Sequence, residues 1–155
     1  MKVPRVYADT SVIGGCFDPE FALWSNALFQ DFELGRLQPV VSTVVFAEVA
    51  SAPPHVREKY AELIAAGAEM LEDSEEADEL HRLYVQRGIL GPKYNNDMWH
   101  IAFATAATVD VLVSWNFKHI VRFDKIRLFN AASLELGYRS IEIRSPREVT
   151  AYEQD

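Results

Sequence analysis

Short β-rich runs alternate with segments of helical periodicity along this chain of 155 residues. The clearest strand runs from Val111 to Val113, because an unbroken apolar run suits a parallel strand that is covered on both faces. Turn-forming residues bound most of the other short runs. The predicted strands cover residues 6–8, 40–41, 69–71, 111–113 and 140–143.

Helices are predicted where apolar residues recur every three or four positions and where glycine, proline or a capping side chain ends the pattern. After the first strand, Gly14-Gly15 is expected to break the chain. The predicted helices cover residues 19–34, a short segment that Ser42 or Thr43 caps and that carries Glu48, residues 55–66, 74–86 and 95–108, two short helices after Asn116, and a last helix that opens at Pro146.

Strands separated by helices imply an α/β fold, in which right-handed crossovers place helices on both faces of a parallel sheet. The length fits one domain over residues 1–155, and no repeat, linker or low-complexity stretch interrupts it. In such folds the working crevice lies beyond the carboxyl ends of the strands, at a switch in strand order.

Four polar side chains stand at the places where this crevice is expected. Asp9 and Asn116 each follow a predicted strand, Asp97 opens a helix, and Glu48 lies inside a short one. Apolar segments seldom carry acids unless something offsets the cost of desolvation, and a divalent cation is the usual partner. If the fold brings the four together, the site is that of a cation-dependent hydrolase of phosphodiesters.

The chemistry of that reaction suits these residue types. Phosphodiester hydrolysis needs an activated water and neutralisation of the charge that develops on phosphate, and one or two Mg²⁺ or Mn²⁺ ions supply both. Mg²⁺ takes few carboxylates and keeps several waters, so three acids and an amide are adequate. The four histidines show no zinc-binding spacing.

Each of the four residues also has an ordinary structural reading. Asp9 could belong to a simple turn, and Glu48 could be an exposed helix residue. Asp97 suits the first turn of a helix by compensating its dipole, and Asn116 could be a cap. Their order along the chain is more specific than any one of them.

Composition and charge narrow the class of protein. Hydrophobic residues make up 49% and charged residues 25%, which is typical of a globular domain. No apolar run is long enough to span a membrane and no secretion signal is visible, so we expect a soluble, cytoplasmic protein. The single cysteine, Cys16, fits a reducing compartment and is read as a small core thiol rather than a nucleophile.

The net charge of −8 argues against a general nucleic-acid coat. Six acids gather within Glu72 to Glu79, where they fit the solvated start of a helix. The last 45 residues, by contrast, hold seven Lys and Arg against six Asp and Glu.

A basic stretch follows Asn116 directly. Its members are Lys118, His119, Arg122, Lys125 and Arg127. Lys118 and Arg122 are candidates for holding RNA phosphates beside a metal. The alternative is a solvated helix face on which Arg122 or Lys125 pairs with Asp124. The neighbouring Trp115 and Phe117 could stack on bases, although core packing is the alternative for both.

At these residues the chain resembles the PIN-domain family, which includes the VapC-type toxin ribonucleases. The similar motifs are D-T-S-V from Asp9, A-E ending at Glu48, the Asp97 helix with Ala102 and Ala104, and S-W-N-F from Ser114. They span nearly the whole chain, and their order and spacing are more telling than any single motif.

The resemblance implies a three-layer α/β/α sandwich with a central parallel sheet, dependence on Mg²⁺ or Mn²⁺, and single-stranded RNA as the substrate. It also implies that a homodimer and inhibition by a cognate antitoxin protein are common among such proteins. Asp9, Glu48 and Asp97 fall on the family's three acidic positions, and Ser114 falls on the hydroxyl position that supports the first metal ligands.

Asn116 departs from the family, because many relatives have a fourth acid there. An amide coordinates through a neutral oxygen, so a second ion should bind less well. The leading hypothesis is a metal-dependent endoribonuclease with Asp9, Glu48, Asp97 and Asn116 as ligands. Such an enzyme could be the toxin of a type II toxin–antitoxin pair. The alternative is a catalytically weak PIN-fold protein that acts by binding.

Two other folds that use a reactive aspartate fit this sequence poorly. A haloacid-dehalogenase phosphatase needs a second acid two residues after its nucleophile, where this chain has Ser11. A phospho-receiver domain places its acceptor aspartate after the third strand, and nothing matches there cleanly.

Overall fold

The computed structural model describes residues 2–150 and contains one parallel five-stranded sheet. Its order is β3-β2-β1-β4-β5. The strands are β1 Arg5–Ala8, β2 Gln38–Ser42, β3 Glu69–Leu71, β4 Val111–Val113 and β5 Glu142–Arg144. The predicted strands are therefore confirmed, although the last begins two residues later than its expected range of 140–143.

The chain changes direction across the sheet once. It lays down β2 and β3 on one side of β1, then returns to place β4 and β5 on the other side. Ala8 of β1 pairs with Val113 of β4 at the carboxyl ends of these two central strands. The switch in strand order therefore lies between β1 and β4, directly before Asp9 and Ser114.

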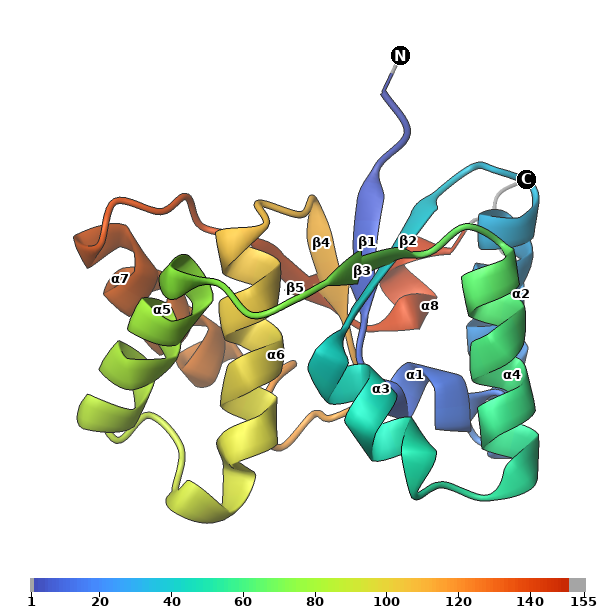
Figure 1. Cartoon of the computed structure of the whole chain (residues 1–155), viewed down its shortest axis with the longest axis horizontal. Coiled ribbons are helices and arrows are strands. Elements are labelled where there is room, and N and C mark those ends of the chain that lie inside the picture. Colours follow the sequence, from blue (N-terminus) through green and yellow to red (C-terminus); the bar gives the residue numbers. More distant parts are fainter. Residues whose placement is uncertain (1, 151–155) are drawn as a thin grey trace.

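Helices cover both faces of the sheet, which confirms the three-layer α/β/α sandwich (Figure 1). In that view α5, α6 and α7 lie to the left of the strands, and α2 and α4 lie to the right. The helices are α1 Thr10–Gly15, α2 Ala22–Glu33, α3 Thr43–Ala50, α4 Pro54–Ala65, α5 Glu75–Gln86, the short 3₁₀ helix η1 Pro92–Tyr94, α6 Asn95–Ala106, α7 Phe123–Glu135 and α8 Pro146–Val149.

Side-chain caps start two of these helices where the sequence predicts them. Ser42 accepts a hydrogen bond from the backbone N–H of Val44 at the start of α3. Ser74 does the same for Ala77 at the start of α5, whose first turn also carries three acids. The acidic run is thus a helix start stabilised by its cap and by the helix dipole.

The prediction that Gly14-Gly15 breaks the chain is wrong, because α1 runs through both glycines. Gly15 serves packing instead. A Cβ built there would lie 2.6 Å from Nε1 of Trp115 and 2.7 Å from Oγ of Ser25. The missing side chain leaves room for Trp115 to pack against the first turns of the fold.

The prediction of two short helices after Asn116 is also wrong. A single helix, α7, occupies Phe123–Glu135. Before it, the backbone N–H groups of Ile120 and Val121 both donate to the carbonyl of Asn116, which makes a tight turn rather than a helix.

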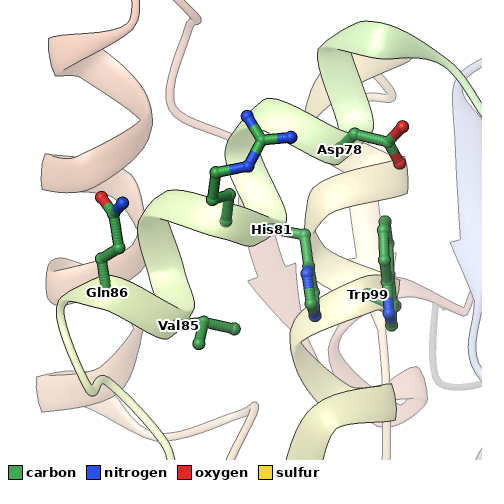
Figure 2. A pocket seen from close by; sticks show the side chains of 6 residues that line it. Asp78, His81, Val85, Gln86 and Trp99 are labelled. Atoms are coloured by element: carbon green, nitrogen blue, oxygen red, sulfur yellow. The ribbon is translucent and has the colours of Figure 1, made fainter.

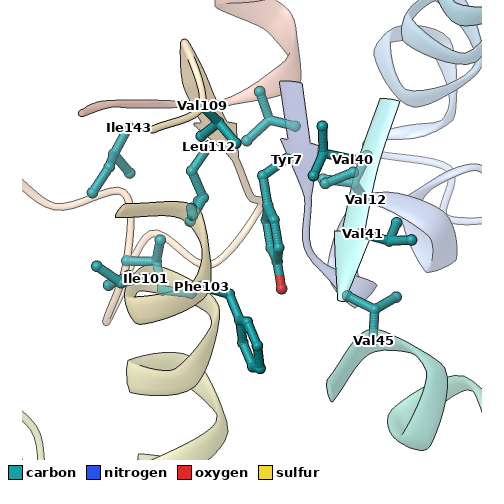
Figure 3. Close-up of a cluster of buried hydrophobic side chains, with 14 of the residues drawn as sticks. Tyr7, Val12, Val40, Val41, Val45, Ile101, Phe103, Val109, Leu112 and Ile143 are labelled. Atoms are coloured by element: carbon teal, nitrogen blue, oxygen red, sulfur yellow. The ribbon is translucent and has the colours of Figure 1, made fainter. Parts of the chain in front are cut away.

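The core lies between the sheet and its two helical layers. Figure 3 shows Tyr7 of β1 among apolar side chains of β2, β4, α3 and α6. No helix within residues 2–150 combines the length and apolarity that a membrane span needs.

Candidate active site

Asp9 ends β1 and is only 3% exposed. Oγ of Ser11 donates to its Oδ1 at 2.6 Å, and Oγ of Ser114 donates to its Oδ2 at 2.6 Å. Burial raises the pKa of Asp9; His100 and the two serines act against this rise, and the charge of Glu48 adds to it. The carboxylate is held in place by hydroxyls rather than by a salt bridge.

Glu48 reaches the same region from α3. Its Oε1 accepts hydrogen bonds from Oγ1 of Thr10 at 2.7 Å and from Nε2 of His100 at 2.8 Å. Its Oε2 lies 3.4 Å from Nδ2 of Asn96. Burial raises the pKa of Glu48. The hydrogen bond from His100, the charge of His100 and the hydrogen bonds from Thr10 and Asn96 outweigh burial, so this pKa lies below its ordinary value.

Asp97 lies in the first turn of α6. Burial raises its pKa to about 6; the charges of Asp9 and Glu48 contribute to the rise, and His100 and Asn116 oppose it. The three carboxylates therefore interact through their charges although they come from three separate elements. Repulsion of this kind is what a bound cation would relieve.

Asn116 joins the cluster through its nitrogen. Nδ2 donates to Oδ2 of Asp97 at 3.2 Å, while Oδ1 accepts from the backbone N–H groups of Lys118 and His119 at 3.2 and 3.0 Å. The two backbone donors fix the orientation of the amide. Asn116 thus caps the following turn and holds Asp97, and its oxygen faces the backbone rather than the carboxylates.

Ser114 connects Asp9 to this turn. Its Oγ donates to Asp9 and accepts from the backbone N–H of Asn116 at 2.9 Å. All five residues singled out from the sequence are consequently brought to the carboxyl edge of the sheet. A line of hydrogen bonds runs from Asp9 through Ser114 and Asn116 to Asp97.

The sequence analysis missed two groups that bind Glu48. Thr10 directly follows Asp9, and His100 follows Asp97 by three residues, which places it on the same face of α6. That spacing was the available signal for His100. Burial lowers the pKa of His100, but the hydrogen bond to Glu48 and the charges of the three acids raise it above its ordinary value.

No three His, Cys, Asp or Glu side chains between residues 2 and 150 are grouped closely enough to form a ready-made metal cage. Asp9 and Glu48 instead direct oxygens at neighbouring hydroxyl and imidazole groups. An ion here would therefore keep much of its water, as Mg²⁺ does.

Basic side chains border the cluster on the Asp97 side. His119 packs against Tyr94 with ring centroids 3.7 Å apart, and its Nδ1 lies 3.7 Å from Oδ2 of Asp97. Burial lowers the pKa of His119, and nearby cations lower it further. Those cations, the basic rim of the site, are Lys118, Lys125, Arg122 and Lys93.

The alternative reading of the basic stretch, in which Arg122 pairs with Asp124, is supported by the structure. Arg122 pairs with Asp124 at 2.7 Å, and Lys125 donates to the carbonyl of Ile89 at 2.8 Å. The charges of the rim nevertheless act on His119, whose ring lies beside Asp97.

The two aromatic residues near Asn116 differ in their surroundings. Trp115 is buried, stacks on Phe21 with ring centroids 4.2 Å apart, and donates from Nε1 to Oγ of Ser25. It is a core residue. Phe117 is 50% exposed, so part of its ring is open to solvent.

A hollow of about 370 Å³ between α5 and α6 lies apart from this chemistry (Figure 2). His81 and Trp99 stack there with ring centroids 3.8 Å apart. None of the three carboxylates lines it.

Solved structures with a similar fold include the following two. One is to a chain of the crystal structure of VapBC2 from Rickettsia felis bound to a DNA fragment from their promoter, over 91% of this chain and 98% of that one, with a TM-score of 0.56 and 17% identity. The other is to a chain of VapBC-1 from nontypeable Haemophilus influenzae, over 92% and 98%, with a TM-score of 0.58 and 15% identity.

The chain has a PIN-type fold. The fold predicted from the sequence motifs is thereby confirmed. The sequence matches no protein-family model and no curated protein. At 15–17% identity the likeness concerns the PIN fold alone, so the function has to be argued from the side chains of this site.

Proposed function

We propose that this PIN-type protein is a metal-dependent endoribonuclease that hydrolyses phosphodiester bonds of single-stranded RNA. The observation that carries the proposal is that Asp9, Glu48 and Asp97 lie near the switch in strand order, close enough for their charges to affect one another. The charges of the other two acids help to raise the pKa of Asp97 to about 6. Acids gathered in this way, without an arginine or lysine among them, are suited to a divalent cation.

Mg²⁺ or Mn²⁺ fits this donor set. The three carboxylates offer hard oxygen ligands, and their open spacing suits an ion that keeps several waters. When bound, the ion supplies an activated water and neutralises charge on the phosphate.

The chain's own residues keep the ligands ready. Ser11 and Ser114 orient Asp9, and Thr10 and His100 orient Glu48. Asn116 orients Asp97. Asn116 would become a neutral ligand only if its amide turned away from the two backbone N–H groups that it now accepts from.

The basic rim supports a nucleic-acid substrate. The charges of four cations lower the pKa of His119 on a chain whose net charge is −8, so positive potential is concentrated on the Asp97 side of the carboxylates. Lys118 and Arg122 would hold phosphates next to the scissile one. The exposed ring of Phe117 offers a surface on which an unpaired base can stack, which favours single-stranded RNA.

The likeness to two VapBC structures supports a place in a type II toxin–antitoxin pair, with this chain as the toxin. An antitoxin protein would be its partner, and the chain could also pair with a second copy of itself as a homodimer. A second candidate is a catalytically weak PIN-fold protein that acts by binding. The amide of Asn116 favours this second candidate. Its nitrogen, rather than its oxygen, faces Asp97, so the position at which many members of the family carry a fourth acid offers no negative charge to a cation.

The test is cleavage of single-stranded RNA with Mn²⁺, with Mg²⁺ and with EDTA. We expect cleavage with either ion and none in EDTA, and loss of cleavage in Asp9→Asn, which keeps the size of the side chain and removes its charge. Cleavage of the same length of duplex RNA should be much slower. Persistent RNA binding without cleavage would favour the second candidate.

A further inference from the structure

A buried line of hydrogen bonds leads from the sheet to Glu48. Oη of Tyr7 lies 2.7 Å from Oγ of Ser42 and 2.7 Å from Nδ1 of His100. Nε2 of His100 lies 2.8 Å from Oε1 of Glu48. Tyr7 and Ser42 are fully buried and His100 is 2% exposed, so water does not compete for these bonds.

The direction of the bonds follows from the donors and acceptors. The backbone N–H of Val44 donates to Oγ of Ser42 at 3.2 Å, and the carboxylate of Glu48 only accepts. Nε2 of His100 must therefore carry the proton that points at Glu48, whether or not Nδ1 is protonated. The hydroxyl of Tyr7 is compatible with both protonation states of Nδ1, since it can donate to a bare nitrogen or accept from a protonated one.

The position of Tyr7 explains how the histidine is fixed. Its ring lies among the apolar side chains of the core, and its hydroxyl points between Phe103 of α6 and Val45 of α3 (Figure 3). The imidazole also contacts the ring of Tyr7 edge-on, with centroids 5.7 Å apart. His100 is thus held by Tyr7 of β1, the central strand, which cannot move without disturbing the sheet.

The side chain of Glu48 needs a partner that fixes its orientation. Its side chain is 31% exposed, and a glutamate on a short helix has several rotamers open to it. Thr10 and His100 both bind Oε1, whereas Oε2 has only the longer contact of 3.4 Å with Nδ2 of Asn96 and is the oxygen better placed to turn to a ligand. Helix α6 therefore supplies one carboxylate, Asp97, and also the group that orients another.

We infer that His100 is a positioning residue, held by Tyr7 and Ser42, that sets the orientation of Glu48 for a divalent cation. The inference rests on the proposed function, because the orientation of Glu48 matters to a cation only if the carboxylate cluster binds one. The residues that orient a metal-binding side chain typically change metal affinity by about 10- to 100-fold when they are replaced.

The variant Tyr7→Phe tests this line of hydrogen bonds, and a second buried tyrosine provides a matched control. Tyr84 is also fully buried, and its hydroxyl lies 2.7 Å from Oγ of Ser133. Both variants remove a buried tyrosine–serine bond, and Tyr7→Phe also removes the bond to Nδ1 of His100, so Tyr7→Phe should lower the melting temperature at least as much as Tyr84→Phe. Only Tyr7→Phe should weaken Mn²⁺ binding in a calorimetric titration, by roughly threefold, because it acts one step further from the ligand than His100.

Two variants of His100 provide a second test of its positioning role. A glutamine carries its amide nitrogen near the place of Nε2 and can still donate to Glu48, whereas an asparagine reaches only the place of Nδ1. His100→Asn should weaken Mn²⁺ binding by about tenfold, and His100→Gln should restore most of the loss. A purely structural role would not separate two amides of the same chemistry in this order.

The outcomes separate the two claims. If wild type binds Mn²⁺ and Tyr7→Phe behaves like Tyr84→Phe, while both amides at position 100 bind Mn²⁺ equally, the positioning role is overturned and the proposed function stands. If wild type binds no Mn²⁺ at all, the proposed metal dependence is overturned, and the role of His100 falls with it.

Discussion

At the scale of single residues, Asp97 is the carboxylate whose environment most opposes its charge. Burial, Asp9 and Glu48 raise its pKa from 3.8 to about 6. The unfolded chain releases this proton near pH 3.8, and the folded protein releases it only near pH 6. The contribution of Asp97 to the free energy of unfolding is therefore fully present below pH 3.8 and is lost as the pH rises to about 6.

Asp97→Asn should remove this pH-dependent loss together with the activity. An asparagine keeps the size of the side chain but carries no charge, so in EDTA the variant should melt at a higher temperature than wild type at pH 7 and above. Its advantage should shrink as the pH falls toward 4. Thermal unfolding of both proteins at several pH values measures this, and full RNA cleavage by the variant would remove Asp97 from the mechanism.

The residues of the site were predictable to different degrees. Asp9, Glu48 and Asp97 were found because acids at the ends of apolar runs need a reason to be there. His100 was not, since a histidine on an apolar helix shows no partner until the fold places Glu48 beside it. The orientation of Asn116 also depends on the fold, because the turn that its oxygen caps is not visible as a pattern.

At the scale of elements, α1 connects core packing to the site. It begins directly after Asp9 and carries Thr10 and Ser11, which bind Glu48 and Asp9. Its far end packs against Trp115 through Gly15. A change at Gly15 is therefore transmitted along one short helix to two of the three carboxylates.

Gly15→Ala should destabilise the fold by about 1–3 kcal/mol, because the added methyl overpacks a buried contact. Metal affinity should fall as well, since α1 would shift. Gly14→Ala is the matched control. A Cβ at Gly14 meets nothing within 4 Å, so alanine there should be neutral or stabilising by roughly 0.5–1 kcal/mol through its helix propensity.

Denaturant unfolding and Mn²⁺ titration of both glycine variants measure these effects. If Gly14→Ala and Gly15→Ala behaved alike, the packing reason for the second glycine would be wrong.

The same helix shows why local pattern did not suffice. All five strands and most helices follow from periodicity and from capping residues, which are local signals. Gly14-Gly15 carries the local signal of a break, and only the tertiary contact of Gly15 with Trp115 explains why a helix continues there. The segment after Asn116 was predicted wrongly as well, because charged residues are frequent there and no glycine or proline marks where the turn ends and α7 begins.

At the scale of the whole molecule, charge is arranged in two opposed groups. The carboxylates meet at the switch in strand order, and the basic rim of Lys93, Lys118, Arg122 and Lys125 lies beside them on an otherwise acidic chain. An ion and a polyanion suit these two groups together, since each would offset the charge that the fold concentrates. The central claim is that the carboxylate cluster is a cation site.

The most direct test is the melting temperature with and without Mn²⁺. An ion that binds only the folded protein stabilises it by about 1.4 kcal/mol at ten times its Kd, which corresponds to a rise of roughly 3–6 °C for a chain of this size. Wild type should show this rise and Asp9→Asn should not. Asp31→Asn, which replaces an equally buried aspartate on α2, should melt lower yet keep the rise. Equal shifts in wild type and Asp9→Asn would place any bound ion elsewhere and contradict the account.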